Sequence, residues 1–374
     1  MITPNKKMLK TSLNNKLTPA VFFLLPFLFI PLMFISWVFG GSSIILIPIY
    51  GYFSISILDF IFQSVDKTDV TAKNFKKYSI ILWLWPFVQL FLIFGSLFVI
   101  FNSSKFNTIE AIFLMLSLGI VTGAVGITFA HELMHKKSKI ERMLCDILLA
   151  MVLYSHFRTE HLLVHHRYVG TKKDSVTARF NESFYMFFLR VLPGCLISAW
   201  NVENERLLRN GKKISNSKNP FWLYFGLILL FLTFSYFIGG LFGVLLFVIQ
   251  GIVAIIHLEV INYIEHYGLS RKLLKNGKYE TTKLHHSWNS NQTVSNLLLI
   301  NLQRHSDHHY NPNKSYQLLN AVDRETAPQL PYGYPIMVLL SLFPSLWKKV
   351  MNPRVKEWRK QFYPEVNDWS QSLN

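Results

Sequence analysis

The feature that most constrains this chain is the length of its uncharged stretches. One run of 42 residues without Asp, Glu, Lys or Arg extends from 17 to 58, and another of 40 residues extends from 219 to 258. An α-helix rises about 1.5 Å per residue, so each run is roughly twice as long as the 30 Å hydrocarbon core of a bilayer requires. Gly40-Gly41 and Gly239-Gly240 stand inside the runs and favour turns. Each run therefore predicts a pair of membrane-spanning helices.

Two more uncharged stretches, 78–104 and 111–130, are each long enough for one further span. Only 16% of the residues are charged, against roughly 25% in soluble domains, which argues against a soluble protein. We therefore expect an all-α membrane protein that forms a single domain over residues 1–374 and has six transmembrane helices. The spans are expected at about 19–39, 44–64, 79–101, 110–130, 220–238 and 241–262.

Three other apolar stretches, 143–157, 184–200 and 336–347, are short or contain a charge or a proline. They are too short or too interrupted to cross the membrane. We expect them to form helices that lie at the membrane surface or are buried beside the spans.

The distribution of basic residues predicts the orientation of the spans. All but one of the 38 Lys and Arg precede the first span, separate the second from the third, or lie in the segments 131–219 and 263–374. The exception is Lys105. By the positive-inside rule these segments and both termini are cytoplasmic. The net charge of +17 therefore mostly reflects the orientation of the spans. It leaves a basic cytoplasmic face that suits anionic lipid and an acidic partner protein rather than nucleic acid.

Thirteen histidines are present, and nine of them gather at four places at or beyond the expected cytoplasmic ends of spans. These places are the segments 131–135, 160–166, 262–268 and 303–309. The nine are His131, His135, His161, His165, His166, His266, His305, His308 and His309.

Helical spacing predicts how these imidazoles group. Residues i and i+4 lie on one face of a helix, so His131 with His135, and His161 with His165, can each face one metal ion. His166 projects about 100° from His165 and suits a second ion or a bridge. Segment 305–309 gives one more cluster at i, i+3 and i+4.

Nine imidazoles are too many for one ion, because a closed zinc site needs four ligands and a catalytic one usually three. Two ions of higher coordination number are the simplest interpretation, and iron with positions open to O₂ fits best. Ligating histidines also need a carboxylate or carbonyl on the other ring nitrogen. The candidates for that contact are Glu132, Glu160, Asp174, Glu265 and Asp307. The remaining histidines, His156, His257, His285 and His286, lack the cluster spacing.

Other classes of protein share parts of this pattern. HELMH at 131–135 matches the HExxH motif of zinc proteases, with Glu132 as the general base, but that function leaves most of the histidines unexplained. A metal transporter would place its ligands inside the spans rather than at their ends.

HELMHKK (131–137), EHLLVHHRYVGTKKD (160–174), NYIEHYGL (262–269) and LQRHSDHH (302–309) resemble the four histidine signatures of one family. This is the family of integral-membrane alkane 1-monooxygenases, within the membrane fatty acid desaturase and hydroxylase superfamily. The resemblance covers roughly residues 45 to 355. Val164 and Lys172-Lys173 depart from the family pattern without touching a histidine of the signatures.

The resemblance implies a bacterial inner-membrane enzyme with six transmembrane helices and a cytoplasmic non-haem di-iron site held by the nine histidines. It implies hydroxylation of the terminal methyl of medium- or long-chain n-alkanes to 1-alkanols with O₂. Electrons would come from rubredoxin and its NADH-dependent reductase, and the absence of a CxxC motif here implies a separate rubredoxin. A related di-iron hydroxylase or desaturase acting on another hydrocarbon or on a fatty acyl substrate is the alternative.

The family also uses a residue on the second span, about two helical turns before its end, as a tunnel gate. In this chain that register falls near Gly51, so we expect Gly51 to line the substrate tunnel. Close helix packing is the other role that a glycine in a membrane helix can have.

Overall fold

The computed structural model describes residues 18–65, 76–366 and 368–369. Within these ranges the chain is built from helices, and only isolated β-bridges are found beside them. The described residues exclude the two chain ends and the lysines before the first span. They also exclude two of the lysines between the second and third spans. The part of the orientation prediction that rests on them stays a prediction.

The first uncharged run forms a helical hairpin, as its sequence predicts. Its first arm comprises η1 (Ala20–Leu28) and α2 (Phe29–Phe39). Gly40 then adopts a φ of 59° and a ψ of −158°, a conformation that is essentially restricted to glycine, and reverses the chain. The second arm comprises η2 (Gly41–Ile45), α3 (Leu46–Pro48), the π-helix η3 (Ile49–Ser54) and α4 (Ile55–Phe62).

The third and fourth spans are long helices in the middle of the protein. The third is α5 (Lys76–Asn102). The fourth runs without a break through α6 (Thr108–Val121), the π-helix η4 (Thr122–Gly126) and α7 (Ile127–Met134). Asn107 begins it with a capping box, because its side chain accepts from the Glu110 amide while the Glu110 carboxylate accepts from the Asn107 amide, both at 3.0 Å.

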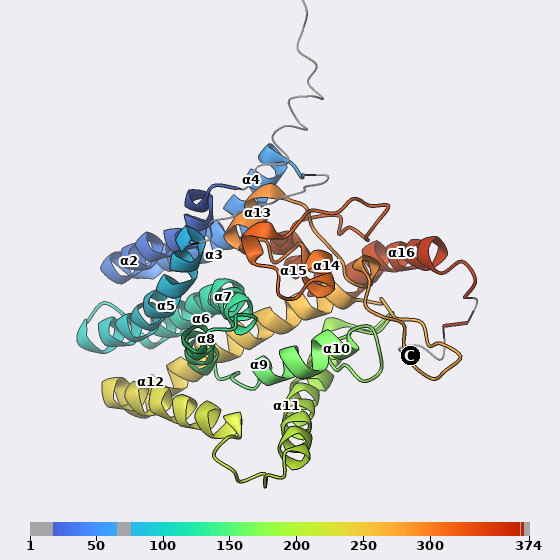
Figure 1. Ribbon diagram of the computed structural model, residues 1–374. Helices are drawn as coiled ribbons and strands as arrows, with labels where there is room; N and C mark the ends of the chain where they lie inside the picture. Colours follow the sequence, from blue (N-terminus) through green and yellow to red (C-terminus); the bar gives the residue numbers. More distant parts are fainter. Residues whose placement is uncertain (1–17, 66–75, 367, 370–374) are drawn as a thin grey trace, which may run out of the picture.

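The fifth and sixth predicted spans are the two limbs of α12 (Pro220–His266). Asn219 caps the helix and Pro220 occupies its first turn. Gly239 and Gly240 break it, the latter at a φ of 58°, and the limbs diverge from that point in Figure 1. The second limb continues one turn beyond the predicted end at 262, and this extra turn carries His266.

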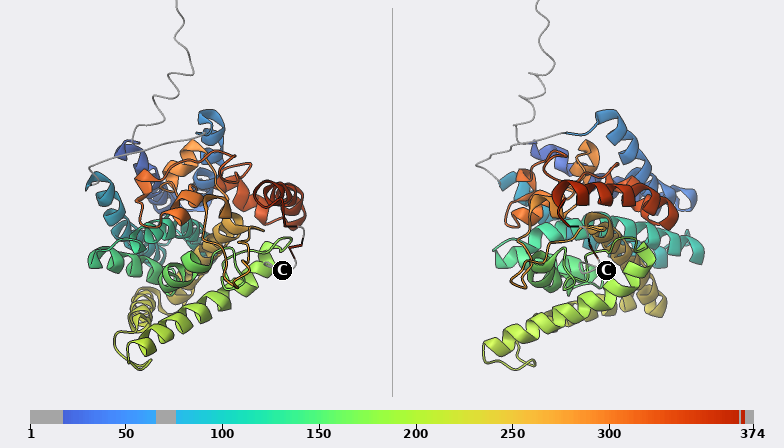
Figure 2. Two further views of the ribbon diagram at one scale, coloured as in Figure 1. Left: turned by 45° about the vertical axis from the view of Figure 1, so that its right-hand side comes forward. Right: turned by 90° about the vertical axis from the view of Figure 1, so that its right-hand side faces the viewer.

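The prediction that the stretch 184–200 is too short and too interrupted to cross a membrane was wrong about the length of the helix. The stretch belongs to α11 (Phe184–Arg209), a helix of 26 residues that continues through Pro193. The charge of Arg190 does not interrupt it, because the guanidinium is paired with Glu182 at 2.9 Å and bonded to the carbonyl of Ser175 at 2.8 Å. Figures 1 and 2 show α11 as one long helix near the first limb of α12, to which a loop joins it.

Six helices in the described part of the chain are long and apolar enough to cross a membrane. Four of them match the first four predicted spans, α12 supplies the predicted fifth and sixth, and the remaining candidate is α11. Large apolar side chains stand exposed on them: Phe60 is 87% exposed, Leu241 80%, Phe237 79% and Phe39 74%. Side chains of this kind at such exposure are typical of a surface that contacts lipid.

The remaining elements pack at the ends of the spans, where the histidines lie. After the fourth span come α8 (Lys139–Met151), α9 (Phe157–Glu160), the π-helix η5 (His161–His165) and α10 (His166–Tyr168). After α12 come η6 (Leu284–His286), α13 (Thr293–Leu298), α14 (His305–Tyr310), η7 (Tyr316–Leu318), α15 (Tyr334–Ser341) and α16 (Pro344–Phe362).

Candidate metal centre

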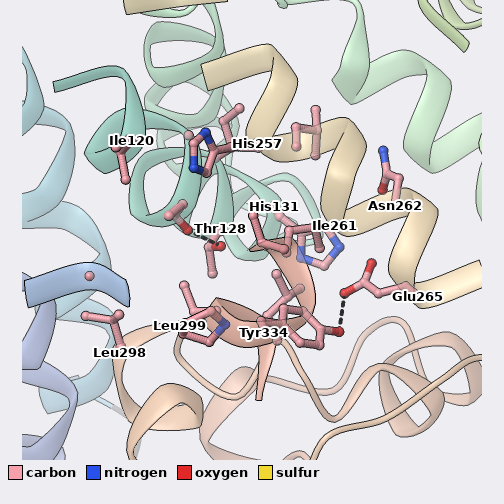
Figure 3. Close-up of a pocket in the computed structure, with 18 of the residues that line it drawn as sticks. Ile120, Thr128, His131, His257, Ile261, Asn262, Glu265, Leu298, Leu299 and Tyr334 are labelled. Carbon is pink, nitrogen blue, oxygen red and sulfur yellow. Dashed lines mark hydrogen bonds between the residues drawn. The ribbon is translucent and has the colours of Figure 1, made fainter. Parts of the chain in front are cut away.

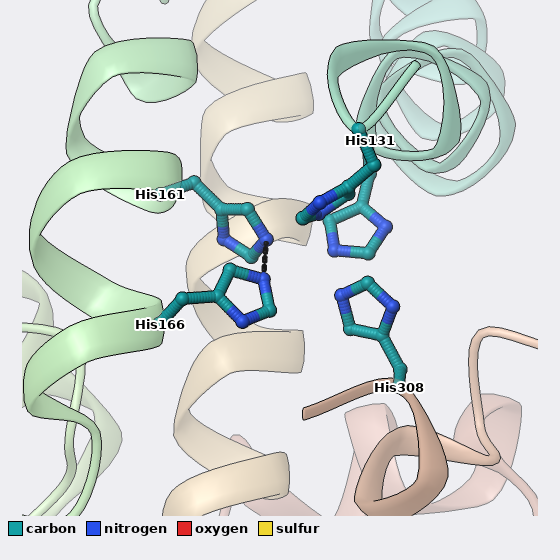
Figure 4. Close-up of side chains that lie close together, drawn as sticks. His131, His161, His166 and His308 are labelled. Carbon is teal, nitrogen blue, oxygen red and sulfur yellow. Dashed lines mark hydrogen bonds between the residues drawn. The ribbon is translucent and has the colours of Figure 1, made fainter. Parts of the chain in front are cut away.

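The fold brings all nine clustered histidines together in two groups, in each of which the facing nitrogens lie within 4.8 Å of one another. Group A consists of His131, His135, His161, His166 and His308. Group B consists of His165, His266, His305 and His309. Figure 4 shows the imidazoles of group A converging from α7, from the η5–α10 segment and from α14.

The groups are divided differently from the division that ideal α-helical spacing predicts. His161 pairs with His166, five residues on, and their Nε2 atoms lie 2.9 Å apart, whereas His165 belongs to group B. The cause is the π-helical turn at His161–His165, in which more residues fill one turn and position i+5 returns to the face of position i. His308 and His309 are likewise divided, because successive helical residues point about 100° apart.

The separations between ring nitrogens fit metal ligation. In group B the Nε2 of His309 lies 3.2 Å from that of His165 and 2.9 Å from that of His305, which lies 3.1 Å from that of His266. Two nitrogens bound at right angles to one ion, with bonds of about 2.1 Å, would be roughly 3.0 Å apart, whereas a tetrahedral ion would place them about 3.4 Å apart.

Several ring nitrogens of the groups are buried and have no hydrogen-bond partner, among them Nε2 of His131, His135 and His308. Buried polar atoms are nearly always satisfied, so orphaned nitrogens that face one another indicate a site for an ion. The residues present thus fit a metal ion in each group, and a site made of imidazole ligands suits iron among other transition metals.

The groups also hold their imidazoles in the form that binds metal. Burial lowers the pKa of His135 to about 3, and it lowers the pKa of His308 and His309 well below the usual value, helped by the neighbouring imidazoles. His161 and His305 are affected in the same way. Neutral imidazole is the ligand form, so no proton has to leave these rings near neutral pH before an ion binds.

Among the five candidate carboxylates, Asp174 and Glu265 contact histidines of group B. Asp174 Oδ2 lies 3.0 Å from Nδ1 of His165 and accepts a hydrogen bond from Thr177, so it orients the ring from behind. Glu265 Oε2 lies 3.2 Å from Nε2 of His305, and its other oxygen accepts a 2.6 Å bond from the Tyr334 hydroxyl. The Tyr334 contact holds this carboxylate at the edge of the group.

The other three carboxylates have no hydrogen bond to a histidine of the two groups. Glu132 pairs with Lys136 and accepts from the Tyr316 amide, an arrangement that also leaves it poorly placed as a protease base. Asp307 binds Lys314 at 2.6 Å and the Asn320 amide at 2.7 Å, which fastens α14 to the segment that follows it. Glu160 is fully buried, and burial together with Asp174 and Glu259 raises its pKa well above the usual value.

A largely apolar cavity leads to the histidines (Figure 3). At one end it is lined by His131, His161 and His305 together with Glu265 and Tyr334. Away from the histidines its walls are mostly apolar and come from the first, second, fourth and sixth spans, from α13 and the residues after it, and from α15. These lining residues are Phe29, Gly51, Ile120, Gly123, Ala124, Leu258, Ile261, Leu298, Leu299, Leu302 and Val338. Gly51 lines this cavity, and its place in a substrate tunnel and its role as a gate stay predictions.

Among the polar residues that line this cavity, Tyr52 and Tyr334 were not predicted from the sequence, whereas for His257, inside the sixth span, the sequence left open a place in a cavity wall or a satisfied buried position. The spacing of His257, Ile261 and Glu265 places all three on one helical face, a signal that favours the cavity wall for His257. His285 and His286 belong elsewhere, because both bond the Tyr363 hydroxyl, at 3.1 and 2.6 Å, and so tie η6 to the end of α16.

Comparison with known proteins identifies the family of this chain. A model of the fatty acid desaturase family matches residues 107–340. Alkane 1-monooxygenase 2 of Pseudomonas aeruginosa is 41% identical over 261 residues, which cover 70% of this chain and 68% of the relative. Alkane 1-monooxygenase 1 of the same organism is 44% identical over 245 residues, covering 65% and 63%. The alkane 1-monooxygenase of Ectopseudomonas oleovorans is 44% identical over 248 residues, covering 66% and 60%.

A helical membrane fold with histidine groups at the span ends, together with the family match, defines the class: the chain belongs to the fatty acid desaturase family. Within that family it groups with the alkane 1-monooxygenases, which confirms the resemblance seen in the sequence. The matched segment spans only about 60–68% of the length of these relatives.

Proposed function

We propose that this protein is a membrane-bound non-haem di-iron monooxygenase that hydroxylates the terminal methyl of medium- and long-chain n-alkanes to 1-alkanols. One oxygen atom of O₂ enters the alkanol and the other leaves as water, a reaction that consumes two electrons and two protons. The observation that carries the proposal is the cavity, whose apolar walls end at two adjacent groups of histidines.

The nine histidines would hold two iron ions, five ligands in group A and four in group B. When bound, the ions supply the redox chemistry that activates O₂ toward a strong C–H bond. Group A and group B are adjacent, since the ring centroids of His166 and His309 are 4.6 Å apart.

The residues of the chain bind and orient the substrate. An alkane offers no polar handle, so its position is set by the shape of the apolar walls formed by Ile261, Leu298 and Leu299. His131, His161, His305 and Glu265 line the cavity at its histidine end, and the mostly apolar walls beyond them disfavour water there.

Electrons would come from rubredoxin, reduced by an NADH-dependent reductase. The net charge of +17 favours association with an acidic partner of this kind. The protein would lie in the bacterial inner membrane as a single domain with both termini and the histidine groups on the cytoplasmic side, as the distribution of basic residues suggests.

The test is conversion of dodecane by purified protein in nanodiscs with rubredoxin, its reductase and NADH, combined with metal analysis. We expect about two irons per chain and 1-dodecanol as the product, with one atom of ¹⁸O₂ incorporated. An alkene product would instead establish a desaturase, and one zinc per chain with no alkanol would contradict the proposal altogether.

A further inference from the structure

A hydrogen-bonded pair of polar side chains, Tyr52 and His257, lies in the cavity away from the histidine groups. Tyr52 belongs to the π-helix η3 in the second span and His257 to the second limb of α12, and the Tyr52 hydroxyl bonds Nε2 of His257. Both side chains line the cavity. Neither contacts any of the nine clustered histidines by a hydrogen bond in the described part of the chain.

The geometry fixes the direction of this bond. Nδ1 of His257 lies 3.0 Å from the carbonyl oxygen of Val253, which can only accept. Nδ1 therefore carries the ring proton, and Nε2 accepts from the Tyr52 hydroxyl. The two side chains thus satisfy each other and join the second span to the sixth across the cavity.

The helix backbone that carries His257 is held in place, because the fourth span packs directly against it. A Cβ added to Gly123 would come within 2.7 Å of the His257 Cβ and 2.8 Å of the Ala254 Cα. Only glycine permits this approach. Opening the pair would also leave two polar groups without partners among apolar walls, which is costly in a dry cavity.

The pair lies at a defined depth. His257 precedes Glu265 by eight residues on α12, and Gly123 precedes His131 by eight residues on the fourth span. At about 1.5 Å per residue both helices place the pair roughly 12 Å from the histidine end. Ile120 lines the cavity one helical turn beyond the level of Gly123, so the cavity extends past the level of the pair.

We propose that the Tyr52–His257 pair is the floor of the substrate cavity and sets the longest alkane that can reach the histidine groups. The proposal rests on the proposed function and names its specificity-determining residues. Two apolar side chains could rotate away from a longer chain, whereas a hydrogen-bonded pair without other partners holds its place.

The test compares Tyr52→Phe and His257→Ala with the wild type, using octane, dodecane and hexadecane supplied together. One additional methylene in an apolar pocket changes discrimination by roughly 10- to 200-fold, so removing the His257 ring should raise the ratio of hexadecanol to octanol at least about tenfold. Tyr52→Phe removes only the hydroxyl and should shift the ratio the same way by less. His156→Ala, at a half-buried histidine outside the cavity, is the matched control and should leave the ratio unchanged.

A second readout separates this proposal from the proposed function. The wild type and the three variants, purified in nanodiscs, are incubated with the alkane mixture, and the bound hydrocarbon is extracted and measured by gas chromatography. A longer bound chain in His257→Ala supports the floor even if no alkanol forms. Wild-type length distributions in both Tyr52→Phe and His257→Ala, or the same shift in His156→Ala, would overturn it. If His257→Ala does not fold, Tyr52→Phe decides, since it preserves the packing of the ring.

Discussion

Replacing Asp174 by Asn should weaken the binding of the metal ion proposed for group B and leave the binding of the ion proposed for group A unchanged. The Asp174 carboxylate lies 3.0 Å from Nδ1 of His165, and its surroundings are dry, because both side chains are about 1% exposed or less. A hydrogen bond to a charged group contributes about 1.5–3 kcal/mol and a neutral one about 0.5–1.5 kcal/mol. The substitution should therefore cost about 1–1.5 kcal/mol of binding free energy, which is roughly a tenfold loss of metal affinity.

The assay is anaerobic loading with Fe²⁺ followed by titration with a chelator, with the iron that remains on the protein measured by mass spectrometry. Asp174→Asn should release one iron per chain at about a tenfold lower chelator concentration than the wild type. Asp307→Asn is the control, because Asp307 is also a buried acid beside a clustered histidine but bonds Lys314 and the Asn320 amide instead. Release curves identical to the wild type for Asp174→Asn, or equally early release from Asp307→Asn, would refute this account of the site.

Three further predictions concern the ligands, the cavity and pH. His308→Ala should abolish alkane hydroxylation while the protein still inserts into membranes, whereas His156→Ala should keep much of its activity; full activity of His308→Ala membranes would contradict the ligand assignment. A Cβ at Gly51 would meet only Phe29, at 3.5 Å, so Gly51→Trp should fill cavity space and selectively reduce hexadecanol among products from mixed alkanes, and a uniform loss of all products would instead indicate damaged packing. Burial lowers the pKa of His135 to about 3 and that of His156 to about 4, so between these values and the usual 6.5 the unfolded chain binds protons that the folded chain does not. The melting temperature of the metal-free protein should thus fall between pH 7.5 and 5.5, and a constant value would argue against buried neutral rings.

The sequence alone determined the class of fold and the set of candidate ligands. Runs without charge can only be tolerated at such length in a membrane, and the turn at Gly40 follows from a backbone conformation that other residues avoid. The nine histidines stand at helical spacing beside those runs, so their gathering at the span ends could be predicted without coordinates. These are local properties, set by hydropathy and by the geometry of a single helix.

The tertiary structure decided how the histidines are shared and what lies around them. Spacing along an ideal α-helix pairs His161 with His165, but the π-turn pairs it with His166, and a π-turn has no reliable signature in the sequence. α11 continues past Arg190 because Glu182 neutralises that charge, a contact that only the fold provides. The Tyr52–His257 bond joins residues 205 positions apart, and no local pattern relates them. Contacts between distant segments depend on how whole helices pack, and that information is spread over the entire chain.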